Sequence, residues 1–96
     1  MRDRFLVAYD ITDKDRLRQV HMVLMGFGDP LQYSVFDCRL SEKEVVLLIT
    51  ALSEIISPAD DKVLLARLGP EGGRSSLGLK FLGRRDTAPE RKPLVI

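Results

Sequence analysis

An aspartate inside an apolar run near the N-terminus raises the first question of chemistry. Residues 5–11 are FLVAYDI, and Asp10 is the one charged residue among them. An aspartate at the end of a strand commonly forms a turn or caps a helix. Thr12 and Asp13 follow and can supply that cap, so the Asp10 carboxylate is left for another role. The pattern therefore leaves a turn and a site as alternatives, and one carboxylate alone makes a poor Mg²⁺ site.

Two arginines follow this carboxylate on the next predicted helix. Arg16 and Arg18 carry guanidinium groups, which donate hydrogen bonds in a planar fork that suits phosphate oxygens. Residues two apart on a helix point in different directions, so these two cannot form a single clamp. A solvated helix face is the alternative interpretation.

The elements that would position these side chains follow from periodicity. Residues 5–11 are apolar, aromatic or β-branched apart from Asp10, which predicts a central strand buried on both faces. The next helix begins at Thr12 or Asp13 and ends by Gly26, and Pro30 prevents its resumption. Its apolar stripe consists of Leu17, Val20 and Leu24.

A second helix begins after Ser41, because Ser41 and Glu44 have the spacing of a capping box. Its predicted stripe consists of Val45, Leu48, Ile49, Leu52, Ile55 and Ile56, and Pro58 ends it. Residues 31–40 are rich in β-formers. A hairpin there would have to turn near Tyr33 and Ser34 without a glycine, so the pattern alone predicts one long strand.

Two further strands complete the expected order. Residues 61–68 form the first, and residues 79–83 form a short edge strand after a turn-rich segment. The result is an α+β chain with the split β-α-β pattern of ferredoxin-like folds. Residues 1–83 would form this domain, and residues 84–96 a basic C-terminal tail.

Composition favours a globular domain. Hydrophobic residues make up 45% of the chain and charged residues 30%. Neither a membrane-spanning run nor an export signal is visible, so we expect a cytoplasmic protein with no membrane partner. The single cysteine, Cys38, has no partner for an internal disulfide and is expected in the core.

Three segments carry a resemblance to a known family. FLVAYDITDKDRLRQV, GDPLQYSVFDCRLSEKE and ISPADDKVLLARL resemble the Cas-two family, small CRISPR-associated proteins that work beside the CRISPR integrase in spacer acquisition. The similarity covers residues 4–68, with a looser match at LKFLG. The chain departs from the family at Pro30, since members usually carry an arginine shortly before the Gln-x-Ser-Val-Phe string.

The resemblance implies a ferredoxin-like homodimer whose hairpin before the second helix is tight and whose extra C-terminal strand is exchanged with the partner. It also implies that Asp10 of both protomers lies at the dimer axis, as catalytic residue and shared Mg²⁺ ligand. Arg16 and Arg18 would bind nucleic acid, DNA or RNA. Three residues are expected in supporting roles: Tyr9, whose hydroxyl could position Asp10, and Ser34 and Phe36. On pattern alone, Phe36 is better explained as a core residue than as a base-stacking platform.

Two classes of function follow from the resemblance. The first is a metal-dependent endonuclease that acts with the CRISPR integrase, and the second is a non-catalytic dimeric scaffold that holds DNA. A toxin-type ribonuclease of the same fold is a third class, for which the basic tail would be unnecessary.

Overall fold

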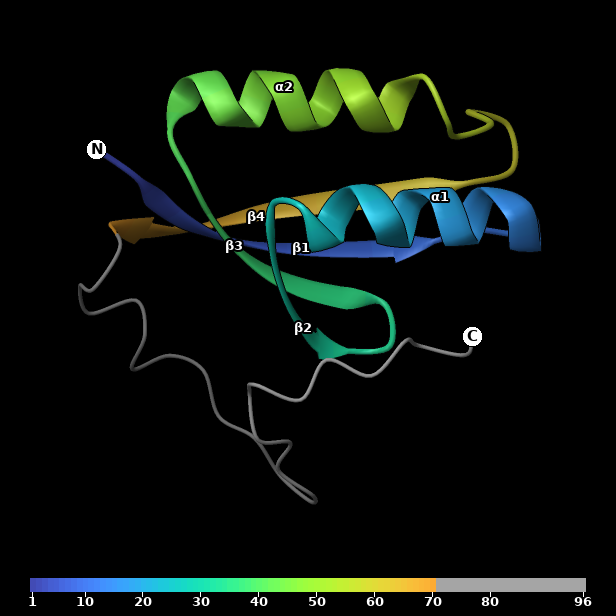
Figure 1. The fold of residues 1–96 in the computed structure, drawn as a ribbon, viewed down its shortest axis with the longest axis horizontal. Coiled ribbons are helices and arrows are strands. Elements are labelled where there is room, and N and C mark those ends of the chain that lie inside the picture. The colour runs from blue at the N-terminus through green and yellow to red at the C-terminus, as the bar shows by residue number, and fades with distance from the viewer. Residues whose placement is uncertain (71–96) are drawn as a thin grey trace.

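The strands and helices follow one another in the order β-α-β-β-α-β in the computed structural model, which describes residues 1–70 (Figure 1). The elements are β1 (Asp3–Asp10), α1 (Lys14–Met25), β2 (Gly28–Gln32), β3 (Val35–Leu40), α2 (Glu42–Ser53) and β4 (Lys62–Pro70). This is the predicted ferredoxin-like order. The predicted strand at 79–83 and the tail at 84–96 lie outside the described residues.

The four strands form one antiparallel sheet in the order β2-β3-β1-β4. β1 pairs with β3 on one side and with β4 on the other, so it is an interior strand. β2 and β4 are the two edges of this sheet. Pro30 lies in β2, which fits an edge strand because proline has no N–H to donate to a ladder.

The hairpin between β2 and β3 corrects the expectation of one long strand across residues 31–40. β2 ends at Gln32 and β3 begins at Val35, so Tyr33 and Ser34 form the turn. The tight hairpin implied by the family resemblance is therefore confirmed. No described residue other than glycine has a positive φ. Tyr33 and Ser34 therefore turn the chain within ordinary backbone conformations, so the turn needs no glycine.

Side-chain caps fix the start of both helices as the sequence predicts. The Asp13 carboxylate accepts from the backbone N–H groups of Asp15 and Arg16, so Asp13 is the N-cap of α1. Ser41 and Glu44 form the expected capping box of α2, and the Glu44 side chain also pairs with Arg2. Neither helix is long and apolar enough to cross a membrane.

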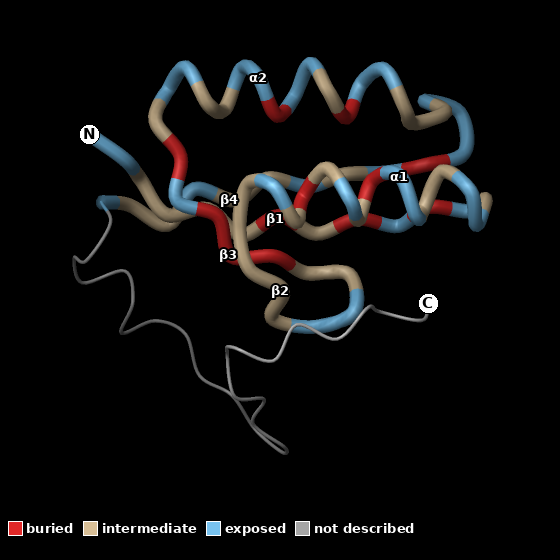
Figure 2. The backbone as a smooth tube through the Cα atoms, viewed as in Figure 1, coloured by how far each residue is buried: buried red, intermediate tan, exposed pale blue. Residues whose placement is uncertain are grey.

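Both helices pack on one face of the sheet, and the core lies between the helices and the sheet. The buried stretches of α2 in Figure 2 turn toward the strands, and its exposed stretches turn away. The core consists of Val7, Tyr9, Ile11, Val20, Leu24, Phe36, Cys38, Leu40, Leu48 and Leu52. Ile49, which the helical stripe placed among the core residues, is 47% exposed. No helix of residues 1–70 covers the second face of the sheet, so the expected burial of β1 on both faces is not met within the described part.

A close approach between β2 and β3 surrounds the single cysteine. A Cβ placed on Gly28 would lie 2.5 Å from the Asp37 carbonyl oxygen and 2.5 Å from the Cys38 sulfur. Cys38 is fully buried, as predicted, and burial raises the pKa of its thiol to about 12. Only glycine therefore fits this position without moving the two strands apart.

Replacing Gly28 with alanine should destabilise the fold by about 1–3 kcal/mol, since the added methyl group must displace the β3 backbone. Urea unfolding of Gly28→Ala beside the wild type measures the change. Gly26→Ala is the matched control, because a Cβ there meets only the Val23 carbonyl oxygen, at 3.3 Å, and φ is −82°. Equal stability of the two variants would contradict the packing argument.

Candidate metal and nucleic-acid site

Asp10 is the last residue of β1 and is exposed at the end of the sheet. Its register partner in β4 is Lys62. Side chains alternate between the two faces of a strand, so Asp10 shares a face with Ala8 and Leu6, opposite to Tyr9. Because Tyr9 enters the helix-covered core, Asp10 lies on the second face of the sheet, which no helix of residues 1–70 covers.

The Tyr9 hydroxyl serves the neighbouring turn and does not position Asp10, which corrects that expectation. It donates to the Tyr33 carbonyl oxygen at 3.0 Å and lies 3.3 Å from Nδ1 of His21. The Tyr9 backbone N–H also donates to the Ser34 carbonyl oxygen at 3.1 Å. Tyr9 thus holds both residues of the β2–β3 turn, and burial raises the pKa of its hydroxyl.

Phe36 and Ser34 contribute to this cluster structurally. Phe36 is fully buried, with its ring centroid 6.3 Å from that of Tyr9 and 5.3 Å from that of His21. The interpretation of Phe36 as a core residue is therefore confirmed, and its face is not available to a base. Ser34 is half-buried and takes part through its backbone carbonyl.

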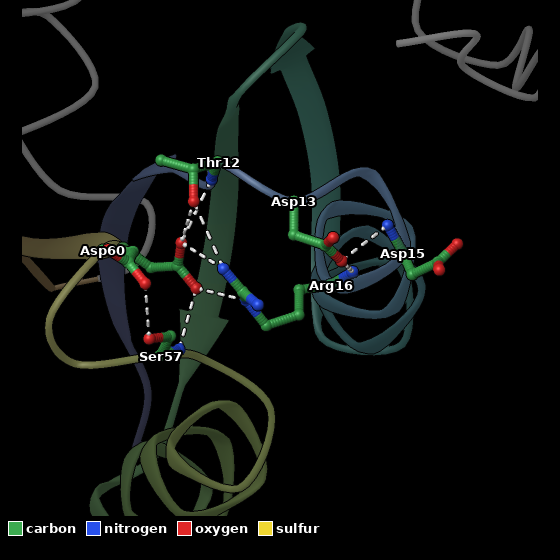
Figure 3. Close-up of polar contacts among 7 residues, drawn as sticks. Thr12, Asp13, Asp15, Arg16, Ser57 and Asp60 are labelled. Carbon is green, nitrogen blue, oxygen red and sulfur yellow. Dashed lines mark hydrogen bonds and ion pairs between the residues drawn. The ribbon is translucent and has the colours of Figure 1, made fainter.

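A buried carboxylate that the motifs did not identify lies at the same end of the sheet as Asp10. Asp61 directly precedes β4, and its side chain has no exposed surface. Its two oxygens accept from the backbone N–H groups of Thr12, at 3.1 Å, and Ser57, at 2.8 Å. Figure 3 shows how Thr12 and Ser57 approach from two separate loops. The carboxylate thereby joins the β1–α1 loop to the α2–β4 loop.

Arg16 completes this cluster. Its Nε donates to Asp61 at 2.8 Å, and its Nη2 lies 3.2 Å from the Thr12 hydroxyl oxygen (Figure 3). The charge-assisted hydrogen bonds from Arg16 hold the pKa of the Asp61 carboxyl well below its usual range, and those from the backbone act in the same direction. An arginine held in this way is part of the fold's internal polar structure.

The two predicted nucleic-acid ligands therefore have different surroundings. The Arg16 side chain is 27% exposed and is bonded to Asp61. The Arg18 side chain is 70% exposed and pairs with the similarly exposed Asp15 at 3.8 Å. An exposed pair of this kind contributes little and exchanges readily for a stronger anion. Of the two, Arg18 is the guanidinium that is better placed to meet a phosphate.

The donor set that one chain offers to Mg²⁺ at Asp10 is a single carboxylate. Within residues 1–70 no group of three or more His, Cys, Asp or Glu side chains could hold a metal ion. Mg²⁺ takes oxygen ligands, retains several waters and is commonly held by one or two carboxylates. Asp10 supplies one such ligand on an exposed strand end, and Asp10 of a second copy would supply the other.

The comparison with family models agrees with this fold. Residues 2–73 match the model described as "CRISPR associated protein Cas2". The chain belongs to the Cas2 family. This is the Cas-two family whose sequence motifs the chain resembles.

Relatives in the Cas2 family support the same assignment. A protein of Geobacter sulfurreducens named CRISPR-associated endoribonuclease Cas2 is 40% identical over 70 residues, which cover 73% of this chain and 74% of the relative. CRISPR-associated endoribonuclease Cas2 1 of Rhodospirillum rubrum is 36% identical over 92 residues, 96% of this chain and 89% of the relative. The crystal structure of Streptococcus pyogenes Cas2 at pH 6.5 has a TM-score of 0.73 and 27% identity, and covers 83% of this chain and 99% of that one.

If Arg16 is structural and Arg18 is not, their alanine variants should separate in a melting experiment. Arg16→Ala leaves the buried Asp61 carboxylate without its cation, and the melting temperature should fall by about 5 °C or more. Arg18→Ala should stay within about 1 °C of the wild type. Calorimetry at one fixed protein concentration measures both. Equal shifts for the two variants would show that the Asp61 cluster does not hold the fold.

His21 should make stability depend on pH near neutrality. Burial lowers its pKa in the folded state, so the unfolded chain takes up the proton first as the pH falls. The stabilisation by neutral His21 is complete above its unfolded pKa of about 6.5 and is lost as the pH falls below that value. Urea unfolding between pH 7.5 and pH 5 measures this loss.

His21→Gln should show a flatter pH dependence across the same range. The low pKa of Asp61 has its effect at more acidic pH, below about 4, so the two contributions are separable. Parallel curves for the variant and the wild type would mean that another group titrates in this window.

Proposed function

We propose that this chain is a Mg²⁺-dependent endoribonuclease that works as a homodimer with the CRISPR integrase in spacer acquisition. The observation that carries the proposal is the position of Asp10, exposed on the second face of the sheet, in a chain of the Cas2 family whose relatives are named endoribonucleases. RNA is the substrate that these names favour.

The second face of the sheet supports a homodimer. Ala8 pairs in register with Leu64, which is 63% exposed, and Leu6 pairs with Ala66, so apolar side chains lie together on this face where β1 pairs with β4. Two copies that pack these faces together would bury them around a two-fold axis. Because Asp10 shares this face, such packing would also bring the two Asp10 carboxylates toward one another.

The sheet edge at β4 supports the strand exchange. β4 has nine residues and pairs only with β1 among the described strands, so its other edge is available to a further strand. β4 leads directly into residues 71–96, where the additional strand at 79–83 is predicted. Addition of that strand to the β4 edge of the partner would protect the edge and tie the dimer together.

The chemistry at the dimer axis follows from the residues around it. When bound, Mg²⁺ would lower the pKa of a bound water and stabilise charge on the phosphodiester. The two Asp10 carboxylates would hold the ion. Arg18 would bind a backbone phosphate of the substrate through its exposed guanidinium. The Asp61 cluster would keep the β1–α1 loop, and therefore the strand end at Asp10, in one conformation.

Replacing Asp10 with asparagine should abolish Mg²⁺-dependent cleavage of RNA. The substitution removes a charged ligand but keeps the size of the side chain, and loss of such a contact reduces the rate by about 100-fold or more. Cleavage of an end-labelled oligonucleotide at several Mg²⁺ concentrations measures the effect. Sedimentation and melting should show an intact dimer, since Asp10 is exposed and lies outside the core.

Two outcomes would change the proposal. Unchanged cleavage by Asp10→Asn would move the activity to another group. If the wild type cleaves neither RNA nor DNA with any divalent metal, yet binds the integrase, the chain acts as the dimeric scaffold. A stable monomer of the full-length protein would exclude both the shared Mg²⁺ site and the scaffold.

A further inference from the structure

Tyr33 is a large aromatic side chain that the fold leaves in solvent. It is 67% exposed at the tip of the β2–β3 hairpin. The chain has two tyrosines and no tryptophan, and the other tyrosine, Tyr9, is buried. Among the aromatic residues near Asp10 in the described part, Phe36 is also buried, so Tyr33 is the ring that a bound molecule could contact.

The hairpin tip is held against the strand that carries Asp10. The Tyr9 hydroxyl donates to the Tyr33 carbonyl oxygen, and the Tyr9 backbone N–H donates to the carbonyl oxygen of Ser34. Tyr9 directly precedes Asp10, so the exposed ring and the exposed carboxylate lie at the same end of the sheet. Two hydrogen bonds from one residue fix the backbone of the tip, which lowers the entropy lost when its ring binds a ligand.

A positive and a polarizable side chain are exposed on the part of α1 that contacts Tyr9. His21 lies 3.3 Å from the Tyr9 hydroxyl, which places this part of α1 beside the turn. Arg18 precedes His21 by three residues, so the two are neighbours on the helix surface. Arg18 is 70% exposed, and Met22, the residue after His21, is 67% exposed. Arg18 and Met22 are four residues apart, so they are neighbouring exposed side chains on the part of α1 whose His21 contacts Tyr9.

We propose that Tyr33 stacks on an unpaired base of the bound nucleic acid while Arg18 neutralises an adjacent phosphate. Aromatic stacking with a neighbouring cation is how proteins bind single strands without reading their sequence. A duplex keeps its bases stacked on one another, so it offers no free face to Tyr33. The inference rests on the proposed nuclease function and assigns to Tyr33 the contact that distinguishes an unpaired base from a duplex.

The test measures binding in EDTA, where no Mg²⁺-dependent cleavage occurs. The probes are a fluorescein-labelled 12-nucleotide RNA of mixed sequence, the same RNA annealed to its complement, and the DNA versions of both. Tyr33→Ala of the full-length protein should weaken single-strand binding by about tenfold and leave duplex binding unchanged. Tyr33→Phe should bind like the wild type, because the ring is what stacks. An equal loss for single strand and duplex, or no loss at all, would overturn the inference.

A tryptophan at this position provides a direct reading of the contact. Because the chain contains no tryptophan, Tyr33→Trp introduces a single fluorophore. Stacking on a base should quench its emission when single-stranded RNA or DNA is added, and duplex should not. Unchanged emission at saturating single strand would mean that the ring is not in contact with bases. Comparison of the RNA and DNA single strands shows whether the ring stacks on bases of RNA, of DNA or of both.

Val46→Ala is the matched control for a loss of exposed apolar surface. Val46 is 62% exposed on α2, and its replacement should change neither the single-strand affinity nor the duplex affinity. Should Tyr33→Ala bind nucleic acid normally but lose the integrase, Tyr33 belongs to a protein interface and the inference is wrong.

The binding result is independent of the cleavage result. If the wild type cleaves nothing and Tyr33→Ala still loses single-strand affinity, the nuclease proposal fails and the stacking inference stands. If Asp10→Asn abolishes cleavage and Tyr33→Ala binds single strands normally, the reverse holds.

Discussion

The alternation of side chains along β1 is the constraint on which the candidate site depends. β1 is hydrogen-bonded on both sides, so its register cannot slip by one residue without turning Val7 and Tyr9 out of the core. The same alternation directs Asp10 to the opposite face. The packing of Tyr9 in the core therefore determines on which face the Asp10 carboxylate lies, although the two side chains point in opposite directions. Core and site are linked through one strand.

The polar cluster around Asp61 adds a second constraint at the end of that strand. A carboxylate without exposed surface would be costly if it were unpaired, but here backbone N–H groups and Arg16 all donate to it. Thr12 and Arg16 donate from the β1–α1 segment and Ser57 donates from the α2–β4 loop, so the charge is satisfied only when both segments are in position. The cluster therefore favours one arrangement of the loops over any alternative that separates them.

Local patterns were sufficient for the elements, and they failed where distant residues meet. Caps at Asp13 and Ser41 were predictable because each acts within three residues of itself. The hairpin at Tyr33 was missed by pattern alone, since its turn avoids positive φ and leaves no glycine signal. Arg16 and Asp61 are 45 residues apart, and no spacing rule joins them. Asp61 appeared to be only the first residue of a strand, so the role of Arg16 in the fold could not be predicted.

The close contact of Gly28 with Cys38 has a consequence for thiol chemistry. Alkylating reagents and disulfides react with the thiolate, and a thiol whose pKa is about 12 is almost wholly protonated at neutral pH. The sulfur is also fully buried in the core and lies close to Gly28 of β2. Modification therefore requires a local opening of the core that exposes Cys38, and the chain has no other cysteine that could react in its place. The rate of labelling thus reports how often the core opens around Cys38.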